Sequence, residues 1–182
     1  GATLGGAGSI NADVINNVNA EGPKAIAYDV EFLQRTKPQE DTALINAVAK
    51  AGPNKVVLAD SQPNERGESG VFGGEDLLDQ IGARGGNSQI GEDADGVRRR
   101  VPYEVGGLET FPIVAAEVAS GEEITTEDMG GPTAWIDYAG GPGTYPSLPF
   151  SRALNGSFEP GTFKDKIVVI GASLPSLKDI AP

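Results

Sequence analysis

Apolar residues recur along the first third of the chain at two spacings, which predict alternating helices and strands. Ile10, Val14, Ile15 and Val18 follow the spacing of a helix that ends before Gly22. Residues 25–32 then predict a strand, residues 38–51 a second helix, and residues 55–60 a second strand. This alternation favours parallel strands that are connected through helices.

The remainder of the chain predicts shorter elements. Helices are expected at 77–81 and 111–119, and residues 61–74 form a long polar loop. Residues 87–90 and 97–101 predict a hairpin, since the Asp-Gly pair between them favours a tight turn. A strand at 135–138, a Gly/Pro-rich loop, a short helix and a strand at 167–170 follow. Residues 1–9 are glycine-rich and predict a flexible end or a cloning remnant.

These elements predict an α/β fold with a mixed, largely parallel sheet flanked by helices, in a single domain over residues 1–182. We expect the strands at 25–30, 55–59 and 167–170 to be neighbours, with the helices at 10–18 and 40–51 packed on them. Residues 167–170 are all aliphatic, which predicts a central strand covered on both faces.

The composition of the chain excludes several classes of partner and of catalytic chemistry. The chain has a net charge of −12 and a pI of about 4.3, which disfavours nucleic acid and anionic lipid as partners. It contains no cysteine and no histidine, so thiolate chemistry and a histidine base are excluded. Its longest aliphatic run, 167–170, is far too short to span a membrane. We therefore expect the chain as given to be soluble, which is compatible with an excised piece of a membrane protein.

Motif searches point to no catalytic residue, no metal site and no cofactor. The Gly-Gly-Pro-Gly run at 140–143 lacks the Lys-Ser/Thr of a phosphate-binding loop. Ser173 follows a predicted strand, where α/β enzymes place nucleophiles, but no Gly-x-Ser-x-Gly motif surrounds it and no histidine could activate it.

Five polar residues are candidates for binding a ligand. Asp29 and Asp60 each fall at the carboxyl end of a predicted strand, where open parallel sheets bind ligands. The loop that carries Ser173 would lie on the same side if its strand is parallel to the other two. Arg98 and Arg100 supply positive charge and would share one face of their predicted strand. The competing interpretation is structural: the aspartates cap loops and the arginines form surface ion pairs.

Several stretches resemble CHASE2 domains. These are the strand Ala-Ile-Ala-Tyr-Asp-Val-Glu-Phe with the following Pro-Gln-Glu-Asp-Thr-Ala-Leu, the segment Asp-Ala-Asp-Gly-Val-Arg-Arg-Arg-Val-Pro at 93–102, and the runs 135–150 and 163–179. The similarity extends from about residue 25 to residue 182. The chain departs from the family at its front, where a strand and an aromatic/proline segment are expected and the sequence is glycine-rich.

The resemblance implies a non-catalytic sensory domain on the extracytoplasmic face of a bacterial membrane, in a receptor whose output is a nucleotide cyclase or a histidine or serine/threonine kinase. It also implies that the domain touches the bilayer only through flanking helices. An adenylate or guanylate cyclase is favoured. The family pattern names no ligand, so the signal is an unknown small molecule or protein. We also expect a weak homodimer, because such outputs act in pairs while the acidic charge opposes association.

Two alternatives stay open at this stage. One is an enzyme that uses Asp29 and Asp60 for divalent-metal or carboxylate chemistry. The other is a structural spacer that dimerises a receptor kinase.

Overall fold

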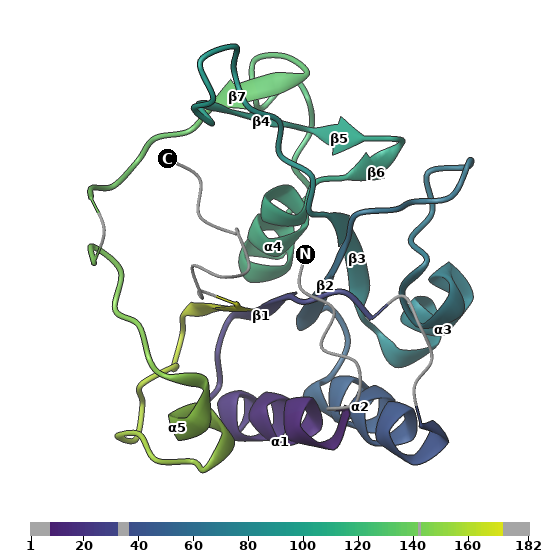
Figure 1. The fold of residues 1–182 in the computed structure, drawn as a ribbon, viewed down its shortest axis with the longest axis vertical. Helices are drawn as coiled ribbons and strands as arrows, with labels where there is room; N and C mark the ends of the chain where they lie inside the picture. Colours follow the sequence, from purple (N-terminus) through teal and green to yellow (C-terminus); the bar gives the residue numbers. More distant parts are fainter. Residues whose placement is uncertain (1–7, 33–36, 142, 173–182) are drawn as a thin grey trace.

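The computed structural model describes residues 8–32, 37–141 and 143–172. Figure 1 shows the described elements in chain order. The helices are α1 Gly8–Asn19, α2 Pro38–Ala51, α3 Glu75–Ile81, α4 Phe111–Ser120 and α5 Phe150–Leu154, with a 3-10 turn at Val71–Gly73. The strands are β1 Ala25–Asp29, β2 Val56–Asp60, β3 Arg84–Asn87, β4 Arg100–Pro102, β5 Glu104–Val105, β6 Leu108–Glu109, β7 Thr133–Trp135 and β8 Ile167–Gly171.

Four strands form one parallel sheet in the order β3-β2-β1-β8. Beside it lie two small antiparallel pairs, β4 with β7 and β5 with β6. The predicted α/β class and the neighbouring strands at 25–30, 55–59 and 167–170 are therefore confirmed, as are the helices packed on them.

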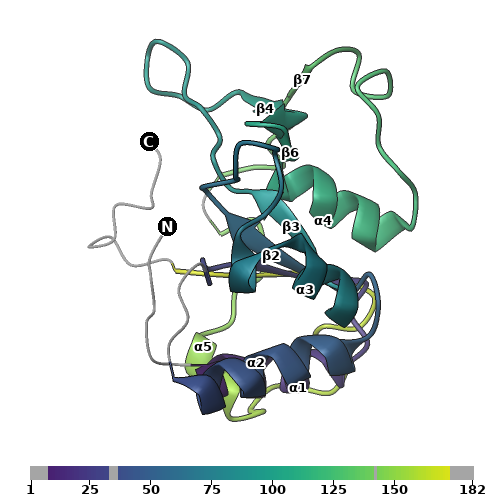
Figure 2. The same ribbon diagram turned by 90° about the vertical axis from the view of Figure 1, so that its right-hand side faces the viewer.

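Strand alternation sorts the core into two layers on either side of the sheet (Figure 2). Ile26, Tyr28, Val56 and Leu58 face α1 and α2 and form the larger core cluster. On the other face, two small strand residues, Ala27 and Val57, pack on α4. Because these side chains are small, the helix comes close to the sheet.

Gly86 on β3 permits this close approach. A Cβ atom at this position would lie 2.7 Å from the Cα of Phe111, at the start of α4. No side chain fits there without moving the helix, so the glycine sets the distance between α4 and the sheet.

The predicted hairpin of 87–90 with 97–101 is wrong. Asn87 ends β3 in the parallel sheet, and β4 pairs with β7 instead. The tight turn itself is present, because the Gly96 N–H donates to the Asp93 carbonyl oxygen. The local Asp-Gly signal indicates the turn, whereas strand pairing depends on partners distant in sequence.

Three further expectations are corrected. Among the described residues β8 is an edge strand of the sheet rather than a central one, and Val169 is 66% exposed. Gly8 and Ser9 belong to α1 and not to the predicted flexible end, and residues 1–7 of that prediction lie outside the described residues. The strand expected at 135–138 lies earlier, at Thr133–Trp135.

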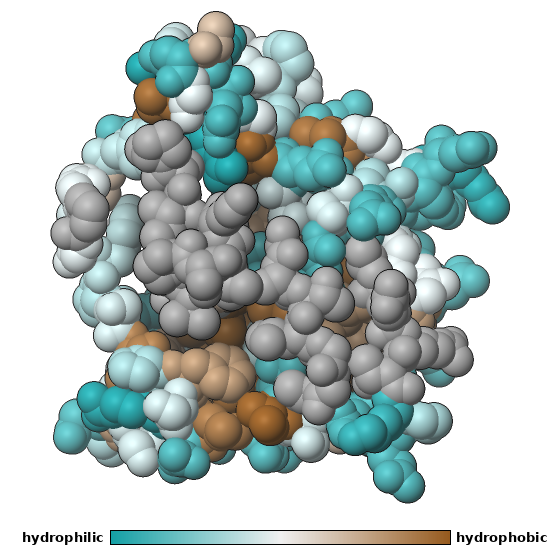
Figure 3. All heavy atoms as spheres, viewed as in Figure 1, coloured by the Kyte–Doolittle hydropathy of each residue, from teal (hydrophilic) through white to brown (hydrophobic). Residues whose placement is uncertain are grey.

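The outer surface of α1 and α5 carries apolar side chains. Figure 3 shows brown, hydrophobic atoms gathered at the bottom of this face, where these two helices lie. Ile10 on α1 and Phe150 on α5 are both exposed large hydrophobic residues. α5 is tied to α1 by the Asn17 side-chain amide, which donates to the carbonyl oxygens of Ala153 and Leu154.

We expect a Tyr28→Phe substitution to lower the free energy of unfolding by about 1–2 kcal/mol. The buried Tyr28 hydroxyl donates to Asn11 Oδ1 at 2.6 Å, and burial raises the pKa of Tyr28. The substitution would leave a buried amide oxygen without this donor. Urea denaturation measures the loss. Tyr138→Phe is the matched control, because the Tyr138 hydroxyl donates to the Arg98 carbonyl oxygen at an exposed position and its loss should cost less than about 0.5 kcal/mol.

Candidate functional site

Asp60 is a buried carboxylate at the end of β2, with no exposed surface. Its Oδ1 accepts a hydrogen bond from the Gln62 N–H at 2.6 Å. Its Oδ2 accepts from the Ser69 hydroxyl at 2.9 Å and from the Gly70 N–H at 2.7 Å. These bonds close the loop 61–70 onto the sheet, so Asp60 holds this loop in place.

Asp29 lies at the same carboxyl end of the parallel strands as Asp60, but on the other face of the sheet. Ala27 pairs with Val57, and Tyr28 pairs with Leu58. Counting on by strand alternation, Asp29 falls on the face covered by α4, and Asp60 on the face covered by α1 and α2. The two carboxylates that the sequence analysis grouped together therefore lie on opposite sides of the sheet.

The three arginines are engaged by acids of their own loop. Arg99 forms a two-bonded ion pair with Asp95, with both distances 2.8 Å. Arg100 pairs with Asp93 and lies over the Trp135 ring, with its guanidinium carbon 5.9 Å from the ring centroid. Arg98 pairs with an acid too, Glu92, at 3.4 Å. Hydrogen bonding to Arg99 lowers the pKa of Asp95 to about 2, so the carboxylate stays charged at neutral pH.

Only Arg100 of these arginines lies in a described strand, so the strand face predicted for Arg98 and Arg100 is not formed. The arginines belong to the β4–β7 region, which is a separate strand pair from the parallel sheet of β1 and β2. Ser173 lies outside the described residues. The structure therefore places Asp29 and Asp60 at the carboxyl ends of neighbouring strands. Among the described residues, the ion pairs of the three arginines are with Glu92, Asp93 and Asp95 instead.

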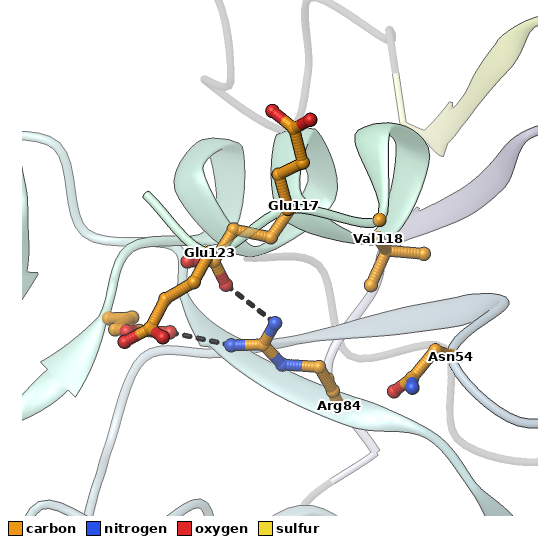
Figure 4. A pocket seen from close by; sticks show the side chains of 8 residues that line it. Asn54, Arg84, Glu117, Val118 and Glu123 are labelled. Carbon is orange, nitrogen blue, oxygen red and sulfur yellow. Dashed lines mark hydrogen bonds and ion pairs between the residues drawn. The ribbon is translucent and has the colours of Figure 1, made fainter. Parts of the chain in front are cut away.

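A cavity of about 360 Å³ lies at the opposite end of the sheet. It is bounded by Asn54 before β2, by Arg84 at the start of β3 and by the last turn of α4. Figure 4 shows the Arg84 guanidinium reaching two carboxylates. Its Nη1 lies 2.5 Å from Glu117 Oε2, and its Nη2 lies 2.6 Å from Glu109 Oε2.

Further hydrogen bonds fix the two glutamates. Glu117 is 5% exposed, and its Oε1 accepts from the Ile124 N–H at 2.7 Å. The Tyr103 hydroxyl donates to Glu109 Oε1 at 2.7 Å, which raises the pKa of Tyr103 to about 12. The network joins β3, β6 and α4 with the loop after α4.

The chemistry of this cavity is acidic. Four of its lining residues are glutamates, Glu109, Glu117, Glu122 and Glu123, and one is an arginine. Because Arg84 is already paired with two carboxylates, the cavity disfavours anions and suits groups that donate hydrogen bonds. The described residues contain no group of three or more acidic side chains arranged to hold a metal ion.

The sequence analysis missed this network, although one signal was present. Glu117 is the single acid in the apolar helix Phe-Pro-Ile-Val-Ala-Ala-Glu-Val-Ala-Ser. An acid on the buried side of such a helix requires a cation or several donors. Its partner Arg84 lies on a different element, β3, and only the folded sheet brings the two together.

The fold and these paired charges define a single α/β domain whose polar side chains hold loops and helices in place. Within the ranges that the structure describes, no helix is long and apolar enough to cross a bilayer. The CHASE2 domain family model matches residues 8–182, and the chain belongs to this family. CHASE2 domains are extracytoplasmic sensory domains without catalytic activity. Neither the curated proteins nor the solved structures include a significant match.

Proposed function

We propose that this chain is the input domain of a transmembrane receptor whose cytoplasmic output is an adenylate or guanylate cyclase. Membership of the CHASE2 family over residues 8–182 carries the proposal. Such a domain passes a signal from outside the cell to catalytic domains inside, so it needs a stable fold and a surface that can change state rather than a reaction centre of its own.

The contacts of the acidic residues support this function over a metal-dependent enzyme. Asp60 already accepts three hydrogen bonds from its own loop, and Asp29 lies on the other face of the sheet. Two carboxylates that share one metal ion must converge on it. The sheet itself lies between the two carboxylates that the enzyme alternative requires.

The test compares the purified chain with the complete gene product. Membranes that contain the complete product should convert ATP or GTP to the cyclic nucleotide, and the purified chain should not exceed a buffer blank. A cysteine introduced at Tyr145, which is 74% exposed, should react with a membrane-impermeant maleimide on intact cells. This chain has no cysteine of its own, so within it the label reports one position, and the complete product without the introduced cysteine is the control.

Two results would contradict different parts of this proposal. Turnover by the purified chain would support an enzyme. A complete product that transfers phosphate from ATP to itself and makes no cyclic nucleotide would replace the cyclase by a kinase and leave the input role intact.

A further inference from the structure

One side of β8 is an apolar strand edge. β8 is the outermost strand next to β1, and among the described residues no strand pairs with its other, open side. On the α4 face, Ile167 and Val169 are both exposed large hydrophobic residues. Protein sheets protect such edges with charges, prolines or bulges, and Ile-Val-Val-Ile-Gly has none of these.

The backbone groups of β8 point alternately toward β1 and toward the open side. The Lys24 N–H donates to the carbonyl oxygen of Lys166 at 2.8 Å, so this carbonyl group, just before β8, faces β1. Since these groups alternate along a strand, the N–H and C=O groups of Ile167, Val169 and Gly171 point away from β1. These three residues can therefore form backbone hydrogen bonds with a further strand.

We propose that β8 pairs with β8 of a second copy of this chain, antiparallel, about a two-fold axis at Val169. This pairing sets Val169 opposite Val169 of the second copy and Ile167 opposite Gly171. All three outward-pointing residues then exchange backbone hydrogen bonds across the axis. The inference goes beyond the proposed receptor function and does not depend on which output domain is attached.

The side chains of the edge suit this register. Gly171 has no side chain, so it leaves room for Ile167 of the other copy, which lies on the same face of the sheet. The two Val169 side chains meet at the axis and cover one another from water. The result is an apolar strip, made of Ile167 and Val169 from both copies, on the α4 face of a continuous sheet.

The charges around the edge favour the antiparallel orientation. Lys24, Lys164 and Lys166 are exposed at the amino end of the strands, with one exposed acid, Asp165, among them. Antiparallel pairing keeps these lysine-rich ends of the two copies apart, whereas parallel pairing would place them side by side. The net charge of −12 still repels two copies, so the association should be weak and should strengthen as salt rises.

Sedimentation equilibrium of the chain and its variants tests the pairing. We expect Val169→Asp and Val169→Lys each to weaken dimerisation about tenfold or more, because like charges face each other at the axis. An equimolar mixture of the two variants should recover dimerisation to within about threefold of wild type, since opposite charges then meet. Because Val169 is exposed, each variant should melt within about 2 °C of wild type.

A matched control separates the edge from apolar surface in general. Ile10 on α1 is also exposed, and Ile10→Asp should leave dimerisation unchanged. Val169→Cys should form a disulfide-linked dimer under mild oxidation, because paired strands hold opposite Cα atoms about 5.5 Å apart, within disulfide range. Ile10→Cys should not.

Three results would overturn the proposal. A wild-type chain that stays monomeric at the highest concentration and salt would exclude the pairing. Equal dimerisation of Val169→Asp and wild type would place the interface elsewhere. Amide hydrogens of Ile167, Val169 and Gly171 that are protected from exchange equally at all concentrations would show that a strand of the same chain covers the edge.

Discussion

Replacing Arg84 with methionine is expected to lower the free energy of unfolding by about 3 kcal/mol. Glu117 is buried, and its Oε2 lies 2.5 Å from Arg84 Nη1. Methionine fills similar space but leaves the Glu117 carboxylate buried without its cation. The expected loss is at the lower end of the range for buried pairs, because the Arg84 side chain is 34% exposed. Urea denaturation measures it, and the melting temperature should fall by about 6–12 °C.

A second substitution distinguishes charge from packing. Adding Glu117→Gln to Arg84→Met removes the unpaired charge and keeps an oxygen for the Ile124 N–H. The double variant should therefore recover at least half of the lost stability. If the free energy of unfolding of Arg84→Met lies within about 1 kcal/mol of the wild-type value, the network does not hold α4 to β3 and its proposed structural role is wrong.

Local patterns were sufficient to predict most of the sheet. The strands β1, β2 and β8 and the helices α1, α2 and α4 follow from hydrophobic spacing and from the Gly and Pro residues that end them. The order of the strands agrees with the helix–strand alternation of the first third of the chain.

The position of β8 could not be predicted in the same way. An apolar run predicts a strand covered on both faces, but α4 packs on residues of β1 and β2, so Val169 remains exposed. The β4–β7 pair was missed for a related reason: its two strands are far apart in sequence, and neither is longer than three residues.

The candidate site shows the same limit. The positions of Asp29 and Asp60 at strand ends were predicted correctly, but the faces on which they lie depend on the register of β1 with β2. The network joins Arg84 on β3 to Glu109 and Glu117, which are 25 and 33 residues further along the chain, so residue types alone could not indicate it.

Asp60→Ala is the second substitution with a large expected effect, about 3–4 kcal/mol in the free energy of unfolding. It removes the acceptor for Gln62, Ser69 and Gly70 at a position with no exposed surface. The loop 61–70 should detach from the sheet, and the Gly70 amide hydrogen should exchange with solvent much faster than in wild type. Urea denaturation and hydrogen exchange measure the two effects.

Two milder substitutions should lower the free energy of unfolding by less than Asp60→Ala, and in a defined order. Asp60→Asn keeps one acceptor oxygen and can still donate to the Ser69 hydroxyl, but it cannot accept from both Gln62 and Gly70, so about half the loss is expected. Ser69→Ala removes one donor and should cost about 1 kcal/mol. A loss below about 1 kcal/mol for Asp60→Ala would mean that other contacts hold the loop. The Asp60 carboxylate would then be available for a ligand, and the binding role predicted from its place at the strand end would be the better explanation of why an acid is buried there.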